Sequence, residues 1–144
     1  MERRPVYLAL GSNLGDRREN ILEAVRRLDS RFGPHESLSS LYASEASGFD
    51  GPPFLNAAVR YDLDLEPLQI RRACKEVETE MGRPQKGIEL DSEGRRIYHS
   101  RIIDIDVLLI GDETVDTPEL KVPHPLMKER DFVMVPLGEI LGIC

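Results

Sequence analysis

The chain has 144 residues and a mass of 16.3 kDa, so we expect a single domain over residues 1–144. Its 19 Lys and Arg against 26 Asp and Glu give a net charge of −7, which argues against nucleic acid as a partner because phosphate contacts need clustered positive charge. No apolar run approaches the roughly 20 residues of a membrane-spanning helix. Cys74 and Cys144 give neither a disulfide framework nor a metal cluster, so we expect a cytoplasmic protein with no membrane partner.

The N-terminal part of the chain predicts a strand followed by a helix. Residues 6–10 have the alternation of a buried strand. The Gly-Ser-Asn-Leu-Gly segment at 11–15 lacks the Gly-Lys-Ser/Thr ending of a P-loop, so we interpret it as a turn that leads into a helix. Asp16 is the expected N-cap, with Glu19 completing a capping box, and Gly33 is expected to end the helix.

The next segment predicts the middle strands of the fold. Residues 37–43 are a weaker strand candidate, and the Gly- and Pro-rich stretch 46–53 is expected to be a loop. Residues 54–63 predict a clear strand, because apolar side chains recur at every second position from Leu55. Phe54 and Asn56 then lie on the opposite face of this strand.

The C-terminal half predicts a helix, a loop, a strand and a tail. The helix starts near Glu66-Pro67 and ends at Gly82, and the polar stretch 84–100 is long enough to suggest a lid or a binding loop. Residues 102–110 predict a strong strand, and 122–144 predicts short pieces broken by prolines. This order of elements is that of an α+β, ferredoxin-like fold: an antiparallel sheet with helices packed on one face, plus a C-terminal extension.

The sharpest chemical feature is a pair of aspartates in the last strand. Asp104 and Asp106 are two positions apart, so both project from one face, about 7 Å apart. Two such carboxylates repel each other unless a cation lies between them, and carboxylates together with substrate phosphates are the usual ligands of Mg²⁺. The alternative is a strand whose outer face is only solvated.

Three further groups are candidates for binding a substrate. Phe54 and Asn56 suit a heteroaromatic ring through stacking and amide hydrogen bonds, although Phe54 also suits a core position. His124 is fixed between two prolines, with Arg130 close behind, and is either part of an anion site or a structural histidine. Basic residues make the long loop locally positive, which indicates either an anion-binding lid or solvated charges; they are Arg83, Lys86, Arg95, Arg96 and Arg101.

These residues resemble the 6-hydroxymethyl-7,8-dihydropterin pyrophosphokinase family over nearly the whole chain. The resemblance lies in five motifs in order: Leu-Gly-Ser-Asn at 10–13, Phe-Leu-Asn-Ala-Ala-Val at 54–59, Glu78 with Gly82-Arg83, Arg-Ile-Ile-Asp-Ile-Asp at 101–106, and Val-Pro-His at 122–124 with Arg130 and Phe132. The resemblance implies a ferredoxin-like fold. It also implies Mg²⁺-dependent transfer of diphosphate from ATP to the hydroxymethyl group of the pterin, with release of AMP, in folate biosynthesis.

The resemblance also implies roles for individual residues. Asp104 and Asp106 would hold two Mg²⁺ ions, and Arg83 and Arg101 would act in catalysis. The ATP-binding residues would be Glu78, Arg83, Arg101, His124 and Arg130. The pterin-binding residues would be Ser44, Ala46, Phe54, Asn56 and Phe132, and a lid would include Lys86, Arg95, Arg96 and Tyr98.

Two other functions compete with this interpretation. A non-catalytic ferredoxin-like module that binds a small molecule would explain the fold and the polar sheet face, but not the paired aspartates together with the arginines. Another two-metal nucleotide transferase on the same fold would use a different hydroxyl acceptor. For the favoured function, the expected partners are ATP and the pterin, and we expect a monomer.

Overall fold

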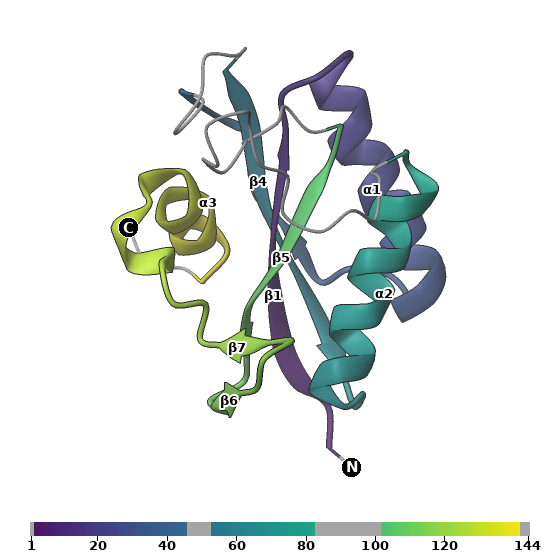
Figure 1. Cartoon of the computed structure of the whole chain (residues 1–144), viewed down its shortest axis with the longest axis vertical. Coiled ribbons are helices and arrows are strands. Elements are labelled where there is room, and N and C mark those ends of the chain that lie inside the picture. The colour runs from purple at the N-terminus through teal and green to yellow at the C-terminus, as the bar shows by residue number, and fades with distance from the viewer. Residues whose placement is uncertain (1, 46–52, 83–101, 142–144) are drawn as a thin grey trace, which may run out of the picture.

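A five-stranded antiparallel sheet forms the centre of the part of the chain that this computed structural model describes, residues 2–45, 53–82 and 102–141 (Figure 1). Its order is β2-β4-β1-β5, with β3 paired to β4 beyond the end of β2. The strands are β1 (Arg4–Ser12), β2 (Ser37–Leu38), β3 (Tyr42–Ser44), β4 (Phe54–Leu63) and β5 (Asp104–Ile110). The predicted strand at 37–43 is therefore two short strands, and β5 begins two residues later than predicted.

Two helices cover one face of the sheet, as the sequence predicts. They are α1 (Arg17–Phe32) and α2 (Pro67–Glu80), which lie side by side in Figure 1. Asp16 caps α1 by accepting a hydrogen bond from the Glu19 backbone at 3.1 Å, and Gly33 ends it with a φ of 89°. The core between these helices and the sheet contains fully buried side chains from both layers, among them Leu8, Leu10, Ile21, Val59, Ile70 and Ile105.

The C-terminal extension covers the opposite face of the sheet. After the β6 (Val115–Asp116) and β7 (Lys121–Val122) hairpin and the short η1 (Met127–Glu129), α3 (Asp131–Leu141) packs on β4, β3 and β1 (Figure 1). A second, smaller core lies beneath α3: Tyr7, Ala58, Leu108, Met127, Val133 and Leu137.

The helix α3 corrects the prediction of short pieces after residue 122. Pro136 lies inside α3, where it removes one backbone hydrogen bond at a typical cost of about 3 kcal/mol. Val133, Pro136 and Leu137 are all buried against the sheet, and tertiary burial of this kind outweighs local helix propensity. Glu139 also connects α3 to the segment between β2 and β3, because its carboxylate accepts hydrogen bonds from the Ser40 backbone N–H and hydroxyl.

Candidate active site

The paired aspartates share one face of β5, as predicted, and this is the sheet face that α3 covers. Ile103, Ile105 and Val107 are buried in the core on the opposite face, whereas Asp104 and Asp106 are half-buried. The adjacent strand β1 places small residues beside both carboxylates. Gly11 pairs with Asp104, and Ala9 pairs with Asp106. The β1 residues beside the two carboxylates are therefore small, with no side chain at Gly11 and a single methyl group at Ala9.

Glu78 holds the backbone of the aspartate strand. Its side chain is only 5% exposed, and its carboxylate accepts a hydrogen bond from the Ile105 amide at 2.7 Å. Because β5 is the last strand in the sheet order, a backbone N–H on its outer side needs a partner outside the sheet. Glu78 supplies that partner between Asp104 and Asp106. The structure thus gives Glu78 a contact that the sequence did not predict, while its expected contact with ATP stays a prediction.

Three of the predicted pterin residues come together on the same face of the sheet. Asn56 in β4 is 5% exposed, and its Nδ2 donates hydrogen bonds to the Tyr42 carbonyl at 2.9 Å and the Ser44 hydroxyl at 2.8 Å. Ser44 pairs directly with Phe54 across the β3–β4 ladder. Both amide protons of Asn56 are therefore donated within the protein, so a ligand would meet its Oδ1 as an acceptor.

One row of the sheet connects the pterin residues to the aspartates. Gly11 in β1 pairs with Asn56 on one side and with Asp104 on the other. Residues paired directly across neighbouring strands present their side chains on the same face. The amide of Asn56 and the carboxylate of Asp104 are thus separated by a single strand position that has no side chain.

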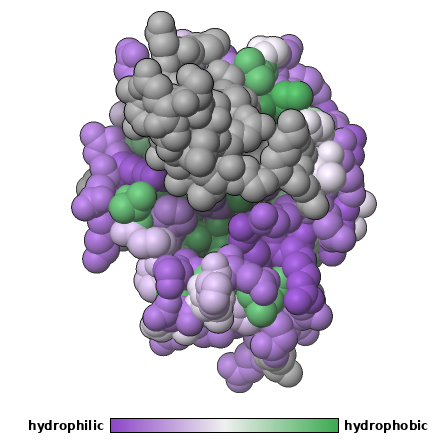
Figure 2. Space-filling model, in the orientation of Figure 1, coloured by the Kyte–Doolittle hydropathy of each residue, from purple (hydrophilic) through white to green (hydrophobic). Residues whose placement is uncertain are grey.

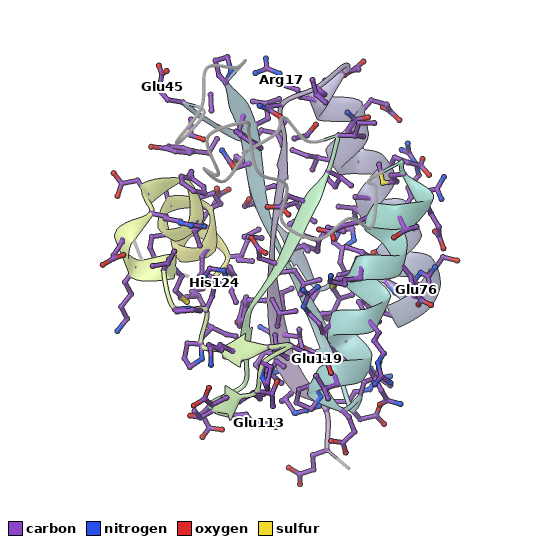
Figure 3. All side chains as sticks on the ribbon, in the orientation of Figure 1. Arg17, Glu45, Glu76, Glu113, Glu119 and His124 are labelled. Carbon is purple, nitrogen blue, oxygen red and sulfur yellow. The ribbon has the colours of Figure 1, made fainter. Side chains whose placement is uncertain are left out.

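His124 lies between α3 and the sheet, where Figure 3 labels it. Its backbone N–H donates to the Leu108 carbonyl at 3.1 Å, and the Leu126 backbone N–H donates to its Nδ1 at 3.3 Å. Burial lowers the pKa of His124 and the Arg130 guanidinium lowers it further, while Asp104 opposes this shift. The ring is therefore neutral near pH 7, with its proton on Nε2, where it can donate to an anionic group.

The lowered pKa of His124 predicts a pH dependence of stability. Because the folded chain binds this proton less readily than the unfolded chain, whose histidine has a pKa of 6.5, the free energy of unfolding should fall as the pH drops below 6.5. We expect urea unfolding to show that lowering the pH below 6.5 destabilises the wild type more than it destabilises His124→Gln. An equal loss of stability in the two proteins would contradict the shift.

Arg130 and Phe132 join the site from the start of α3. The Arg130 guanidinium carbon lies 5.6 Å from the centroid of the Phe132 ring, which is a cation–π distance. Phe132 is half-buried and packs against the core beneath α3, on the same sheet face as Asn56 and Asp104. The structure therefore brings the C-terminal candidates to the same face as those of β4 and β5.

The remaining predicted residues lie outside the described part of the chain. They are Ala46 of the pterin group and Arg83, Lys86, Arg95, Arg96, Tyr98 and Arg101 of the catalytic, ATP-binding and lid groups. Their roles stay predictions from the family resemblance.

Sequence reasoning missed the position of Gly11. The segment at 11–15 does make a turn into α1, and Asn20 holds it by donating from Nδ2 to the Leu14 carbonyl at 2.7 Å and the Ser12 hydroxyl at 3.2 Å. Gly11 and Ser12, however, belong to β1 rather than to the turn. A glycine at the end of a buried strand is a signal of close approach by another group, and that signal was available in the sequence.

Comparison with known proteins identifies the family. The profile of the family described as 7,8-dihydro-6-hydroxymethylpterin-pyrophosphokinase matches residues 7–142. The chain belongs to this family. A 2-amino-4-hydroxy-6-hydroxymethyldihydropteridine pyrophosphokinase of Porphyromonas gingivalis is 45% identical over 137 residues, covering 94% of this chain and 89% of that protein. One of the same name from Aquifex aeolicus is 42% identical over 136 residues, covering 94% and 79%.

The family is also found as part of longer proteins. A "Folate synthesis bifunctional protein" of Arabidopsis thaliana is 36% identical over 138 residues, which is 95% of this chain but 27% of that protein. The family membership supports the predicted pyrophosphokinase activity and the ferredoxin-like α+β fold. It gives no support to a non-catalytic binding module.

Proposed function

We propose that this chain transfers a diphosphate group from ATP to the hydroxymethyl group of 6-hydroxymethyl-7,8-dihydropterin and releases AMP, as a step of folate biosynthesis. The family membership and the names of the relatives support this activity. The structural observation that carries it is the row Asn56–Gly11–Asp104, which connects a buried amide acceptor to a carboxylate pair across one strand of the sheet. A pterin ring bound at the Asn56 amide would then direct its hydroxymethyl group toward the two aspartates.

We propose that two Mg²⁺ ions bind with ATP at Asp104 and Asp106. The two half-buried carboxylates on one face fit this ion, because Mg²⁺ takes oxygen ligands, often one or two carboxylates plus substrate phosphates. Within residues 2–45, 53–82 and 102–141, no cluster of three or more His, Cys, Asp or Glu is placed to hold a metal. Phosphate oxygens and water would therefore complete the coordination, which suits ions that arrive with the nucleotide. When bound, the ions would neutralise phosphate charge.

The basic residues and His124 would position the triphosphate. ATP brings about four negative charges to a chain with a net charge of −7, so local cations are required for binding. Arg130 contributes one positive charge beside His124, whose neutral ring offers an Nε2–H donor. We assign the same task to Arg83 and Arg101, and a covering role to the lid residues Lys86, Arg95, Arg96 and Tyr98, on the family resemblance.

The proposed reaction needs alignment more than covalent help from the protein. The hydroxymethyl oxygen attacks the β-phosphorus, a new O–P bond forms, and the bond from the β-phosphorus to the oxygen of the α-phosphate breaks to release AMP. The proton of the hydroxyl passes to solvent water as the new O–P bond forms. Transfers of this class depend on an in-line arrangement and on charge stabilisation. Asn56, Ser44 and the two phenylalanines, Phe54 and Phe132, would orient the acceptor, and Ala46 would add a backbone contact.

We also propose that the chain acts as a monomer in the cytoplasm. Among the described residues, no helix is long and apolar enough to cross a membrane. In the part of the face in Figure 2 that is not grey, most residues are hydrophilic and the apolar ones lie in small separate areas, so this described part offers no broad apolar contact for a second copy. Sedimentation equilibrium at micromolar concentration is expected to give a mass near 16.3 kDa, whereas twice that mass would contradict the proposal.

A comparison of acceptors tests the proposed function. The protein is incubated with ATP and Mg²⁺ in the presence of 6-hydroxymethyl-7,8-dihydropterin, of the same ring with a methyl in place of the hydroxymethyl, or of a nucleoside. We expect consumption of ATP only with the hydroxymethylpterin, because only this compound combines the ring with the nucleophile. Equal consumption with the nucleoside would instead support a different nucleotide transferase.

A further inference from the structure

We infer that Gly11 is a positioning residue for the pterin end of the site: its missing side chain leaves room for the Asn56 amide to take the position in which it meets the ligand. This inference rests on the proposed function and adds a determinant of affinity for the pterin that acts through Asn56.

The argument begins with the space above Gly11. A Cβ atom built on Gly11 would lie 3.3 Å from Oδ1 of Asn56 and 3.5 Å from Cδ1 of Phe54, and 3.9 Å from the Leu55 carbonyl oxygen. The contact with Oδ1 is closer than most real Cβ contacts, so one of the two atoms would have to move. The contact with Phe54 is ordinary van der Waals contact, which would fill the space beside the ring rather than displace it.

The Asn56 amide has little freedom to move away. Its Nδ2 donates hydrogen bonds to the Tyr42 carbonyl at 2.9 Å and to the Ser44 hydroxyl at 2.8 Å. The residue is only 5% exposed. A shift of Oδ1 away from Gly11 would rotate or translate the whole amide and strain both hydrogen bonds. Oδ1 is also the atom left to accept a hydrogen bond from a ligand. A methyl group at position 11 therefore acts directly on the recognition atom.

The effect is expected to be confined to one side of the row. Gly11 pairs with Asp104 as well as with Asn56, but the three atoms nearest to its built Cβ all belong to residues 54–56. The carboxylate side of the site is thus less affected than the amide side.

The backbone of Gly11 does not have a positive φ, since the described glycines with positive φ are Gly15, Gly33, Gly82 and Gly111. Alanine at position 11 is therefore free of backbone strain, and within a strand it is normally more stable than glycine.

The test is Gly11→Ala, with binding of the pterin and of ATP measured separately by calorimetry in the presence of Mg²⁺. We expect the Kd of the pterin to rise about tenfold or more, which corresponds to the loss of one good hydrogen bond, and the Kd of ATP to change by less than about twofold. A merely structural role would weaken both ligands together or only lower the melting temperature. An unchanged Kd for the pterin in a folded variant would overturn the inference.

A double-mutant cycle with Asn56→Ala keeps the test decisive if Gly11→Ala is poorly stable. Without the amide, the methyl at position 11 has room, so in the Asn56→Ala background Gly11→Ala should neither weaken pterin binding further nor lower the melting temperature. Additive effects would contradict an action through Asn56.

The single variant Asn56→Ala separates the role of Gly11 from the proposed function. If Asn56→Ala binds the pterin like the wild type, the proposed pterin site itself is wrong. If it binds weakly while Gly11→Ala binds normally, only the role of Gly11 fails.

Discussion

Replacing Asp104 or Asp106 with asparagine is expected to lower kcat by roughly a thousandfold, because metal-bound charge stabilisation is typically worth several kcal/mol and each 1.4 kcal/mol is a factor of ten. Asparagine keeps the size of each side chain but removes the charge that attracts a divalent cation. Both side chains are half-buried on the site face of β5, and the core residues Ile103 and Ile105 on the other face are untouched. The fold should therefore persist, and thermal unfolding should remain cooperative.

The matched control for this prediction is Asp112→Asn, which makes the same change just beyond the end of β5. Asp112 is exposed and lies in the turn after the strand. The control variant should keep wild-type turnover. Calorimetric titration with Mg²⁺ and a non-hydrolysable ATP analogue gives an independent readout, in which both active-site variants should bind the metal–nucleotide complex much more weakly. Normal turnover by either Asp104→Asn or Asp106→Asn would rule out the proposed role of the pair.

Two substitutions at Glu78 are expected to separate support of β5 from contact with ATP. In Glu78→Gln the side-chain amide oxygen can still accept the hydrogen bond from the Ile105 N–H, so stability should stay near that of the wild type. In Glu78→Leu that buried N–H loses its acceptor, at a typical cost of about 1–3 kcal/mol in the free energy of unfolding. Turnover should fall with Glu78→Leu as well, because the N–H belongs to the backbone between the two aspartates.

The nucleotide affinity of Glu78→Gln decides between these roles. If Glu78 acts mainly on the strand, this variant should bind ATP nearly as well as the wild type; if it acts on the nucleotide, ATP binding should weaken at unchanged stability. Glu76→Leu is the matched control on α2, because Glu76 is 62% exposed and its ion pair with Arg31 lies at the surface. Equal destabilisation by Glu76→Leu and Glu78→Leu in urea unfolding would remove the case for a buried supporting hydrogen bond.

Local patterns were sufficient to predict the strands β4 and β5 and the helix α1. Strict alternation identified β4 and placed Asn56 and Phe54 on one face, because the side-chain period of a strand does not depend on its partners. The spacing of Asp104 and Asp106 predicted their common face for the same reason. Asp16 and Gly33 marked the ends of α1, since capping is a property of the residues at the ends themselves.

Features that depend on long-range packing could not be predicted in this way. The register that sets Gly11 between Asn56 and Asp104 arises from three strands that are distant in the sequence, and no local pattern specifies it. Pro136 indicated a break in the chain, but burial of α3 on the sheet outweighs the cost of a proline in a helix. The contact of Glu78 with the Ile105 backbone likewise depends on how α2 packs beside the sheet edge.

The most direct test of the proposed reaction is to follow its products by ³¹P nuclear magnetic resonance, with ATP, Mg²⁺ and 6-hydroxymethyl-7,8-dihydropterin as substrates. Transfer of a diphosphate group predicts AMP and a pterin product with two mutually coupled phosphorus signals, in equal amounts. The appearance of ADP together with a pterin product that carries a single phosphorus would contradict it, because attack would then have taken place at the γ-phosphorus.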